Sequence, residues 1–198
     1  LNGGGGSDTA DYSAASQGLD VKLALAIAQN TGMGLDVLSS IENLIGGAFK
    51  DRLTGNGCDN VLDSRGAKDL LDGGGGIDTA SSEHAASGVT VNLATHKARG
   101  GAGNDKLQNF ENLLGSAFAD KLTGDLGANH LIGAGGDDTI EGGLGDDTLE
   151  GGAGLNTLSY AGAGSAVTVS LLAGTTSGGG GSDSFTGFAW LTGSAFGD

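Results

Sequence analysis

Residues 142–158 read GGLGDDTLEGGAGLNTL and contain the same nine-residue frame twice. In each copy, glycines and an acidic or amide residue precede one large apolar residue. The apolar residues recur at intervals of nine, at Leu122, Leu131, Ile140, Leu149 and Leu158, and again at Leu53, Leu62, Leu71 and Ala80. A helix cannot form between such closely spaced glycine loops. The pattern therefore predicts three-residue strands, each with its apolar residue in the middle, separated by six-residue turns.

The composition agrees with a chain of short strands and tight turns. It has 42 glycines and no proline in 198 residues, and proline would remove backbone donors from a sheet. With 9 basic and 24 acidic residues the formal net charge is −15, so we expect neither nucleic acid as a partner nor membrane insertion. The single cysteine, Cys58, excludes an internal disulfide bond. Cations are the partners that this charge favours.

A longer repeat divides the chain into three cassettes, at about residues 1–70, 71–148 and 149–198. Each opens with a glycine loop and continues into an alternating stretch: LDVKLALAI (19–27), VTVNL (89–93) or VTVSL (167–171). The alternation predicts strands there. The stretches outside the nine-residue frame, residues 11–30, 82–99 and 159–177, are predicted to form wider coils without bound metal. We find no linker and expect one continuous array over residues 1–198.

These repeats predict an all-β fold, a right-handed parallel β-roll or β-solenoid. Two nonapeptides make one coil, so that apolar residues of successive repeats face each other across a thin core. Loops of alternate repeats then stack along one edge, about 4.8 Å apart. The glycines let carbonyl oxygens converge and the aspartates add carboxylates. Such an all-oxygen cage suits Ca²⁺ better than Mg²⁺, which requires a tighter octahedral geometry.

A single Gly-Asp loop is common turn chemistry, but the recurrence of the frame favours several calcium sites. The complete or nearly complete loops end at Asp8, Asp78, Asp105, Asp138, Asp147 and Asp183, and looser ones end at Asp36, Asp51, Asp69 and Asp120. The predicted metal-binding residues are Gly3, Gly4, Gly6, Asp8, Asp36, Asp69, Gly73, Gly74, Gly76, Asp78, Gly100, Gly101, Gly103, Asp105, Asp120, Asn129, Gly133, Gly135, Asp138, Gly142, Gly143, Gly145, Asp147, Gly151, Gly152, Gly154, Asn156, Gly178, Gly179, Gly181 and Asp183.

Substitutions within the nine-residue frame indicate which loops should bind calcium more weakly. Asn60, Asn129 and Asn156 keep an oxygen without the charge, so their half-sites should bind calcium more weakly. Phe49, Phe118 and Phe196 replace the third glycine of the frame, and we expect their rings to cap the core. The best site is predicted within residues 124–159. There, Asp138 should stack toward Asn156 and Asp120, and Asp147 toward Asn129.

The many copies of G-G-x-G-x-D resemble the RTX, or haemolysin-type, calcium-binding family of secreted bacterial proteins. The resemblance covers nearly the whole chain. It implies export of an unfolded chain by type I secretion and folding outside the cell, at the cell surface or in the extracellular medium. The chain begins at Leu1 rather than Met and ends within a repeat. We therefore expect it to be part of a longer protein, with the secretion signal elsewhere.

Catalytic motifs such as GxSxG, HExxH and GxxxxGK[ST] are absent, so we expect no enzyme activity in these residues. The first hypothesis is a calcium-rigidified structural region of an adhesin, surface layer or extracellular filament, with possible self-association end to end or with the rest of the parent chain. The alternatives are an accessory module of a secreted enzyme or toxin, and a polysaccharide-binding solenoid. An aromatic or basic stripe would favour the last, and the sequence shows neither. Tyr12 and Tyr160 are interpreted as packing residues rather than sugar-stacking platforms.

Overall fold

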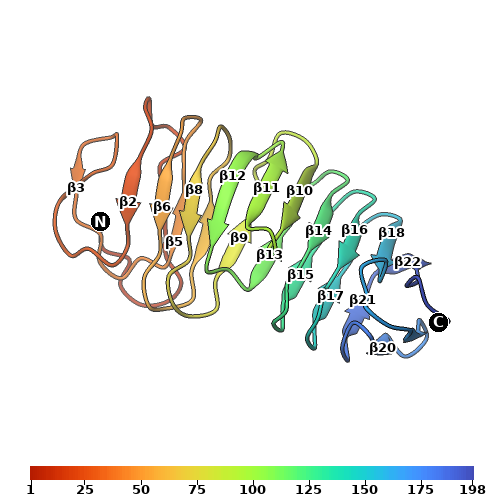
Figure 1. Ribbon diagram of the computed structural model, residues 1–198. Helices are drawn as coiled ribbons and strands as arrows, with labels where there is room; N and C mark the ends of the chain where they lie inside the picture. Colours follow the sequence, from red (N-terminus) through yellow and green to blue (C-terminus); the bar gives the residue numbers. More distant parts are fainter. The chain divides into compact units, whose positions relative to one another are not determined.

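The computed structural model describes residues 1–198, with 22 strands and no helix (Figure 1). The chain forms two compact units. Unit 1 comprises residues 1–86 and 96–110, and unit 2 comprises residues 87–95 and 111–198. No helix long and apolar enough to cross a bilayer is present. The predicted all-β fold of parallel nonapeptide strands is confirmed, whereas the continuity of one array over 1–198 stays a prediction.

Most strands of unit 1 are three residues long, as the nine-residue frame predicts. They are β1 (Thr9–Asp11), β2 (Asp20–Lys22), β3 (Gln29–Asn30), β4 (Leu35–Asp36), β5 (Asn43–Ile45), β6 (Arg52–Thr54), β7 (Val61–Asp63), β8 (Leu70–Asp72), β9 (Thr79–Ser81), β11 (Lys97–Gly100) and β12 (Gly103–Gln108). Strands β1, β5, β7 and β9 form one parallel sheet, and β2, β6, β8 and β12 form another.

Unit 2 repeats this plan. Its strands are β10 (Val89–Asn92), β13 (Asn112–Leu114), β14 (Lys121–Thr123), β15 (His130–Ile132), β16 (Thr139–Glu141), β17 (Thr148–Glu150), β18 (Asn156–Ser159), β19 (Val167–Ser170), β20 (Thr175–Gly178), β21 (Ser184–Thr186) and β22 (Phe188–Thr192). One parallel sheet contains β13, β15, β17 and β21, and the other contains β10, β14, β16, β18 and β22.

The strand register follows the repeat, because two nonapeptides separate paired residues. Leu113 lies beside Leu131, which lies beside Leu149, and in the other sheet Leu122 lies beside Ile140. These middle residues are at most 1% exposed, whereas their neighbours along each strand are half-buried or exposed. The chain alternates between the two sheets. The buried rows therefore meet in a narrow apolar core, as the sequence predicts.

The wider coils contain antiparallel hairpins, which the sequence pattern did not predict. Strand β11 pairs with β12, β19 pairs with β20, and β3 pairs with β4. At the β11–β12 turn, Gly100 and Gly103 pair with each other and have φ values of 112° and 113°. Such tight glycine turns close a hairpin locally, without the long connection that a parallel pairing needs. The parallel register resumes after the insertion, because Leu107 pairs with Leu71.

The predicted strand at residues 19–27 is correct only for Asp20–Lys22. Residues 23–28 form a turn and an irregular segment before β3. Leu23 is still buried, but Leu25 and Ile27 are 38% and 64% exposed. The amide of Gln29 holds this turn, since its Oε1 accepts the Lys22 N–H at 2.8 Å and its Nε2 donates to the Lys22 carbonyl at 2.8 Å. A local side-chain contact therefore ends the alternation.

Replacing one member of the apolar row tests the packing. Leu131→Ala should lower the free energy of unfolding by about 2–5 kcal/mol, because Leu131 is fully buried and the narrow core leaves a cavity. Leu126→Ala is the matched control, since Leu126 lies in a loop and is 77% exposed. Denaturant unfolding in saturating calcium would measure both variants. Equal stability of the two would contradict the proposed core.

Candidate metal sites

The sixth residue of each loop lies at an edge of its unit, where these residues form a ladder of hydrogen bonds. Five of them accept, through Oδ1, the backbone N–H of the residue 18 positions earlier, namely Asp69, Asp78, Asp138, Asp147 and Asn156. The Asp120 N–H donates to Asp138 at 2.9 Å, and the Asp138 N–H donates to Asn156 at 2.9 Å. On the opposite edge of unit 2, the Asn129 N–H donates to Asp147 at 2.8 Å. The three stacked pairs predicted from the spacing are confirmed.

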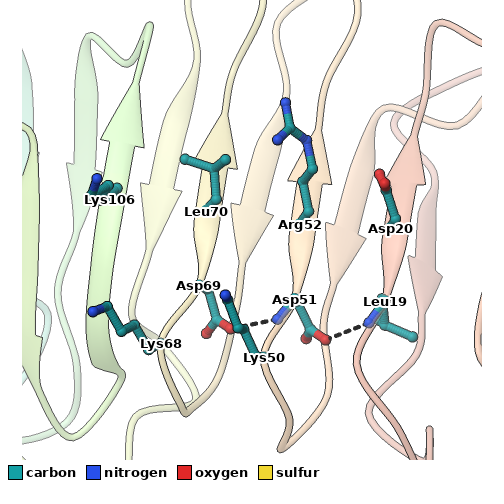
Figure 2. A pocket seen from close by; sticks show the side chains of 9 residues that line it. All are labelled: Leu19, Asp20, Lys50, Asp51, Arg52, Lys68, Asp69, Leu70 and Lys106. Atoms are coloured by element: carbon teal, nitrogen blue, oxygen red, sulfur yellow. Dashed lines mark hydrogen bonds between the residues drawn. The ribbon is translucent and has the colours of Figure 1, made fainter.

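The ladder continues past the inserted hairpins. The Asp147 N–H donates to Asp183 Oδ1 at 3.0 Å, although the two residues lie 36 positions apart. In unit 1, the Asp51 N–H donates to Asp69 at 2.7 Å, and the Asp69 N–H donates to Asp105 at 2.9 Å. Figure 2 shows the rungs from Leu19 to Asp69. Asp105 lies within strand β12 rather than in a loop, yet it still accepts the ladder hydrogen bond from Asp69.

The loops are of two kinds, which differ in whether the second carboxylate oxygen, Oδ2, has a hydrogen-bond partner. In Asp8, Asp69, Asp138 and Asp147, Oδ2 is buried and has no hydrogen-bond partner. A buried carboxylate oxygen without a donor is costly, because it has lost its water and gained nothing in return. A bound cation would satisfy these four atoms.

Glycines leave the space around these oxygens. A Cβ on Gly142 would lie 2.1 Å from Asp147 Oδ2. A Cβ on Gly133 would lie 2.3 Å from Asp138 Oδ2 and 2.6 Å from the carbonyl oxygen of Gly151 in the next coil. Gly133 therefore faces a carboxylate oxygen of its own loop and a carbonyl oxygen of the next coil. That donor set fits Ca²⁺, which takes six to eight oxygen ligands.

Burial also shifts the acidity of these groups. It raises the pKa of Asp69 and of Asp147 to about 7, and nearby carboxylates add to the effect. It raises the pKa of Asp138 and of Asp105 to about 6. Charged carboxylates are thus unfavourable at these positions unless a positive charge lies nearby.

The loops that contain phenylalanine satisfy their carboxylates internally. Asp120 Oδ2 accepts the Ser116 N–H at 2.5 Å, and Asp51 Oδ2 accepts the Gly47 N–H at 2.7 Å. Asp198 likewise accepts the Ser194 N–H at 2.6 Å. The prediction that the phenylalanine rings cap the core is wrong. Phe49, Phe118 and Phe196 are 45–53% exposed, because the fourth loop position points away from the core.

Asp183 is also satisfied without metal. Its Oδ2 accepts the hydroxyl of Tyr160 at 2.7 Å and that of Thr176 at 3.0 Å. Tyr160 is 2% exposed, and its burial raises the pKa of the phenol. Tyr12 is equally buried, so both tyrosines pack inside the fold as predicted.

The predicted loop glycines mostly occupy the second and fourth loop positions, where φ is positive. This group comprises Gly4, Gly6, Gly74, Gly76, Gly143, Gly145, Gly152 and Gly154. Gly154 shows why glycine is needed, since a Cβ there would lie 1.9 Å from the Gly136 carbonyl oxygen. Gly3 and Gly73 occupy the first position and contact the Asp8 and Asp78 side chains. Gly101 lies in the β11–β12 turn between Gly100 and Gly103, and Gly179 lies in the turn that follows β20, between Gly178 and Gly181.

Two predicted positions are displaced. In the loop 133–138, Gly136 rather than Gly135 has the positive φ, at 107°. Asp36 lies in β4, where its carboxylate accepts the Thr31 hydroxyl at 2.5 Å, and it takes no part in the ladder. Glu42 takes that rung, because its Oε2 accepts the Asp8 N–H at 2.9 Å. The sequence could have indicated this role, because Glu42 stands two residues before the core residue Leu44, as the ladder residue Asp51 stands two residues before Leu53.

No group of three or more His, Cys, Asp or Glu side chains is gathered where it could hold a metal ion. Side chains alone therefore do not complete a site, and backbone carbonyl oxygens would have to supply the remaining ligands. This agrees with the glycine frame. It also distinguishes these loops from a zinc site, which would require clustered cysteine and histidine side chains.

Comparison with protein families identifies the repeat. The family model described as RTX calcium-binding nonapeptide repeat (4 copies) matches residues 45–80, 110–140 and 123–158. A search of curated proteins finds no match to this chain. The matched residues include the loops of Asp69, Asp138 and Asp147, in which a carboxylate oxygen lacks a partner.

Proposed function

Since this chain carries calcium-binding nonapeptide repeats and so belongs to the RTX repeat family, we propose that it is a structural region that folds and rigidifies on binding extracellular calcium. Its setting would be a secreted or cell-surface bacterial protein of the adhesin, surface-layer or filament type. RTX repeats are calcium-binding, and the fold is a structural repeat rather than a catalytic scaffold. The location and the coupling of folding to calcium are the new parts of the proposal.

One observation carries the proposal. Asp69, Asp138 and Asp147 are 1–3% exposed, yet each has a carboxylate oxygen without a donor. Without a cation, each group is either a buried charge or a protonated acid. An ion that binds only the folded state stabilises that state by mass action.

The side chains best placed to hold calcium are those of Asp138 and Asp147 in unit 2. Asn129 and Asn156 lie on adjacent rungs, and carbonyl oxygens of the intervening glycine loops complete the donor set. When bound, calcium would supply the positive charge that these carboxylates lack and would tie neighbouring coils together. The chain itself supplies the fixed spacing, since the ladder holds one oxygen of each carboxylate in place.

Asparagine substitution separates metal binding from folding. In Asp147→Asn and Asp138→Asn, the ladder bond should survive, because Asn156 already accepts such a bond at 2.9 Å. Each variant should bind calcium at least about tenfold more weakly, a loss of about 1.4 kcal/mol. In chelator, each should be as stable as the parent chain or more stable, because a buried charge has been removed. Calorimetry would measure the calcium affinity, and circular dichroism in chelator would compare the residual β-structure of each variant with that of the parent chain.

Asp120→Asn is the matched control, since both oxygens of Asp120 already have donors in its own loop and in Val89. It should bind the same number of calcium ions as the parent chain. Unchanged calcium affinity in Asp138→Asn and Asp147→Asn would overturn the assignment of these carboxylates. A loss of stability that is equal with and without calcium would do the same.

A further inference from the structure

The positive charges of this acidic chain are concentrated on one face of unit 1. Eight of the nine Lys and Arg residues belong to this unit. Six of them are exposed on strands β6, β8, β11 and β12 or in the loops that lead into these strands. They are Lys50, Arg52, Lys68, Lys97, Arg99 and Lys106, and we call this set the basic face.

The strand register arranges the basic face in rows. Arg52 lies beside Leu70, Leu70 beside Lys106, and Lys106 beside Lys97. Figure 2 shows Leu70 between Arg52 and Lys106, with Lys50 and Lys68 below them. Neighbouring strands are about 4.8 Å apart, so Lys106 and Lys97 are one strand spacing apart and Arg52 is two strand spacings from Lys106. No basic stripe is visible in the sequence, because these residues are up to 56 positions apart along the chain.

These cations are available to a ligand. None of the six takes part in an ion pair, since the ion pairs of the chain involve only His84 and His130. Four of them line a groove of about 530 Å³, together with the half-buried Leu70 and the exposed Asp20. Asp51 and Asp69, which also line it, are 2–3% exposed and belong to the hydrogen-bonded ladder beneath.

The loops under the basic face differ at one position from the loops of Asp138 and Asp147 in unit 2. Lys50 and Lys68 occupy the fifth loop position, where the loops of unit 2 carry Asp137 and Asp146. There, the aspartate accepts a backbone N–H from the next coil, as in the bond from Leu155 to Asp137 at 2.8 Å. Replacement of this carboxylate by an ammonium group reverses the charge at the exposed fifth position. That position is then suited to an anion, whereas Asp69 in the same loop is buried beneath it.

We propose that the basic face binds a linear acidic polysaccharide, with uronate carboxylates aligned along the rows of cations. A narrow polyanion can follow one face and avoid the carboxylates that give the chain its charge of −15. A broad anionic surface such as a membrane cannot avoid them. The groove residues include no aromatic side chain, which single-stranded nucleic acids use as a stacking platform. This inference goes beyond the calcium-dependent structural role.

The test measures binding of short galacturonate oligomers to the intact chain in saturating calcium, by calorimetry. Lys68→Glu should weaken binding at least about fivefold, and binding by the parent chain should weaken as salt is raised. Lys121→Glu is the matched control. Lys121 is an exposed cation of β14 in unit 2, so the net charge changes equally. Lys106→Glu provides a second variant on the basic face, and circular dichroism would verify that all three variants fold.

The outcomes distinguish binding at the basic face from a general effect of net charge. Equal weakening by Lys68→Glu and Lys121→Glu would show a general charge effect, or calcium bridging, and would overturn the proposal. Absence of galacturonate binding by the parent chain would also overturn it. A single-stranded DNA oligomer of equal charge should bind at least about fivefold more weakly than the galacturonate. Tighter DNA binding that Lys68→Glu abolishes would replace the polysaccharide with nucleic acid.

Discussion

Removal of calcium is expected to abolish most of the β-structure, and its return at about 10⁻⁴–10⁻³ M should restore it. The formal charge of −15 opposes a compact state, and the buried carboxylates of Asp138 and Asp147 each have one oxygen, Oδ2, without a donor. The apolar core is narrow and built of single residues on three-residue strands. Calcium would relieve the charge repulsion and contribute its binding free energy to folding. Circular dichroism during a calcium titration after exhaustive chelation would measure the transition.

Magnesium at the same concentrations is the control and should leave the chain unfolded, because it requires a tight octahedral site and retains its water. A chain that is already β-structured in chelator, and whose spectrum calcium does not change, would contradict calcium-coupled folding. The loops would then act as plain solenoid turns. Calcium would then not control when the chain folds.

Acidification should stabilise the calcium-free fold. The pKa is about 7 for Asp69 and Asp147 and about 6 for Asp105 and Asp138, against about 3.9 for an unfolded aspartate. The folded state therefore binds more protons, and stability is lost as pH rises from about 4 to about 7. Each carboxyl group would contribute at most about 3–4 kcal/mol at the acidic end, at about 1.4 kcal/mol for each tenfold change in proton activity between the unfolded and folded pKa values.

Calcium should reverse this dependence. A bound ion requires the ionised carboxylate, so protons compete with it and stability in saturating calcium should rise over the same pH range. Circular dichroism in chelator at about pH 5 and pH 8, and denaturant unfolding in saturating calcium at the same pH values, would give the two pH dependences. Asp147→Asn should flatten both, because it removes one of the titrating groups. Slopes of the same sign would contradict competition between protons and calcium at these residues.

The repeat unit could be predicted from local sequence alone. Glycine loops at intervals of nine leave room only for a three-residue strand, and the single large apolar residue in each strand must face the core. Leu122, Leu131 and Ile140 are each fully buried, as that spacing requires. The stacking of Asp120, Asp138 and Asn156 follows as well, because a fixed repeat places equivalent residues above one another in successive coils.

Within the loops, the sequence could not show which carboxylates were already satisfied. Asp120 and Asp138 occupy the same position of the frame, yet only Asp138 has an oxygen without a partner. The difference lies in the backbone path of the loop, which directs the Ser116 N–H at Asp120. Likewise, Asp183 is satisfied by Tyr160, which lies 23 residues away. Such contacts depend on folded geometry.

What the sequence determined by itself was the periodic part of this protein: short parallel strands, the apolar row and the oxygen-rich edges. Only the tertiary structure decided the exceptions, namely the antiparallel hairpins, the satisfied carboxylates and the basic face. Regular repeats convert a local pattern into a spatial one, because every coil has the same length. Lys50, Lys68 and Lys106 come together because β6 pairs with β8, and β8 pairs with β12, the second strand of an inserted hairpin; no local pattern encodes that arrangement.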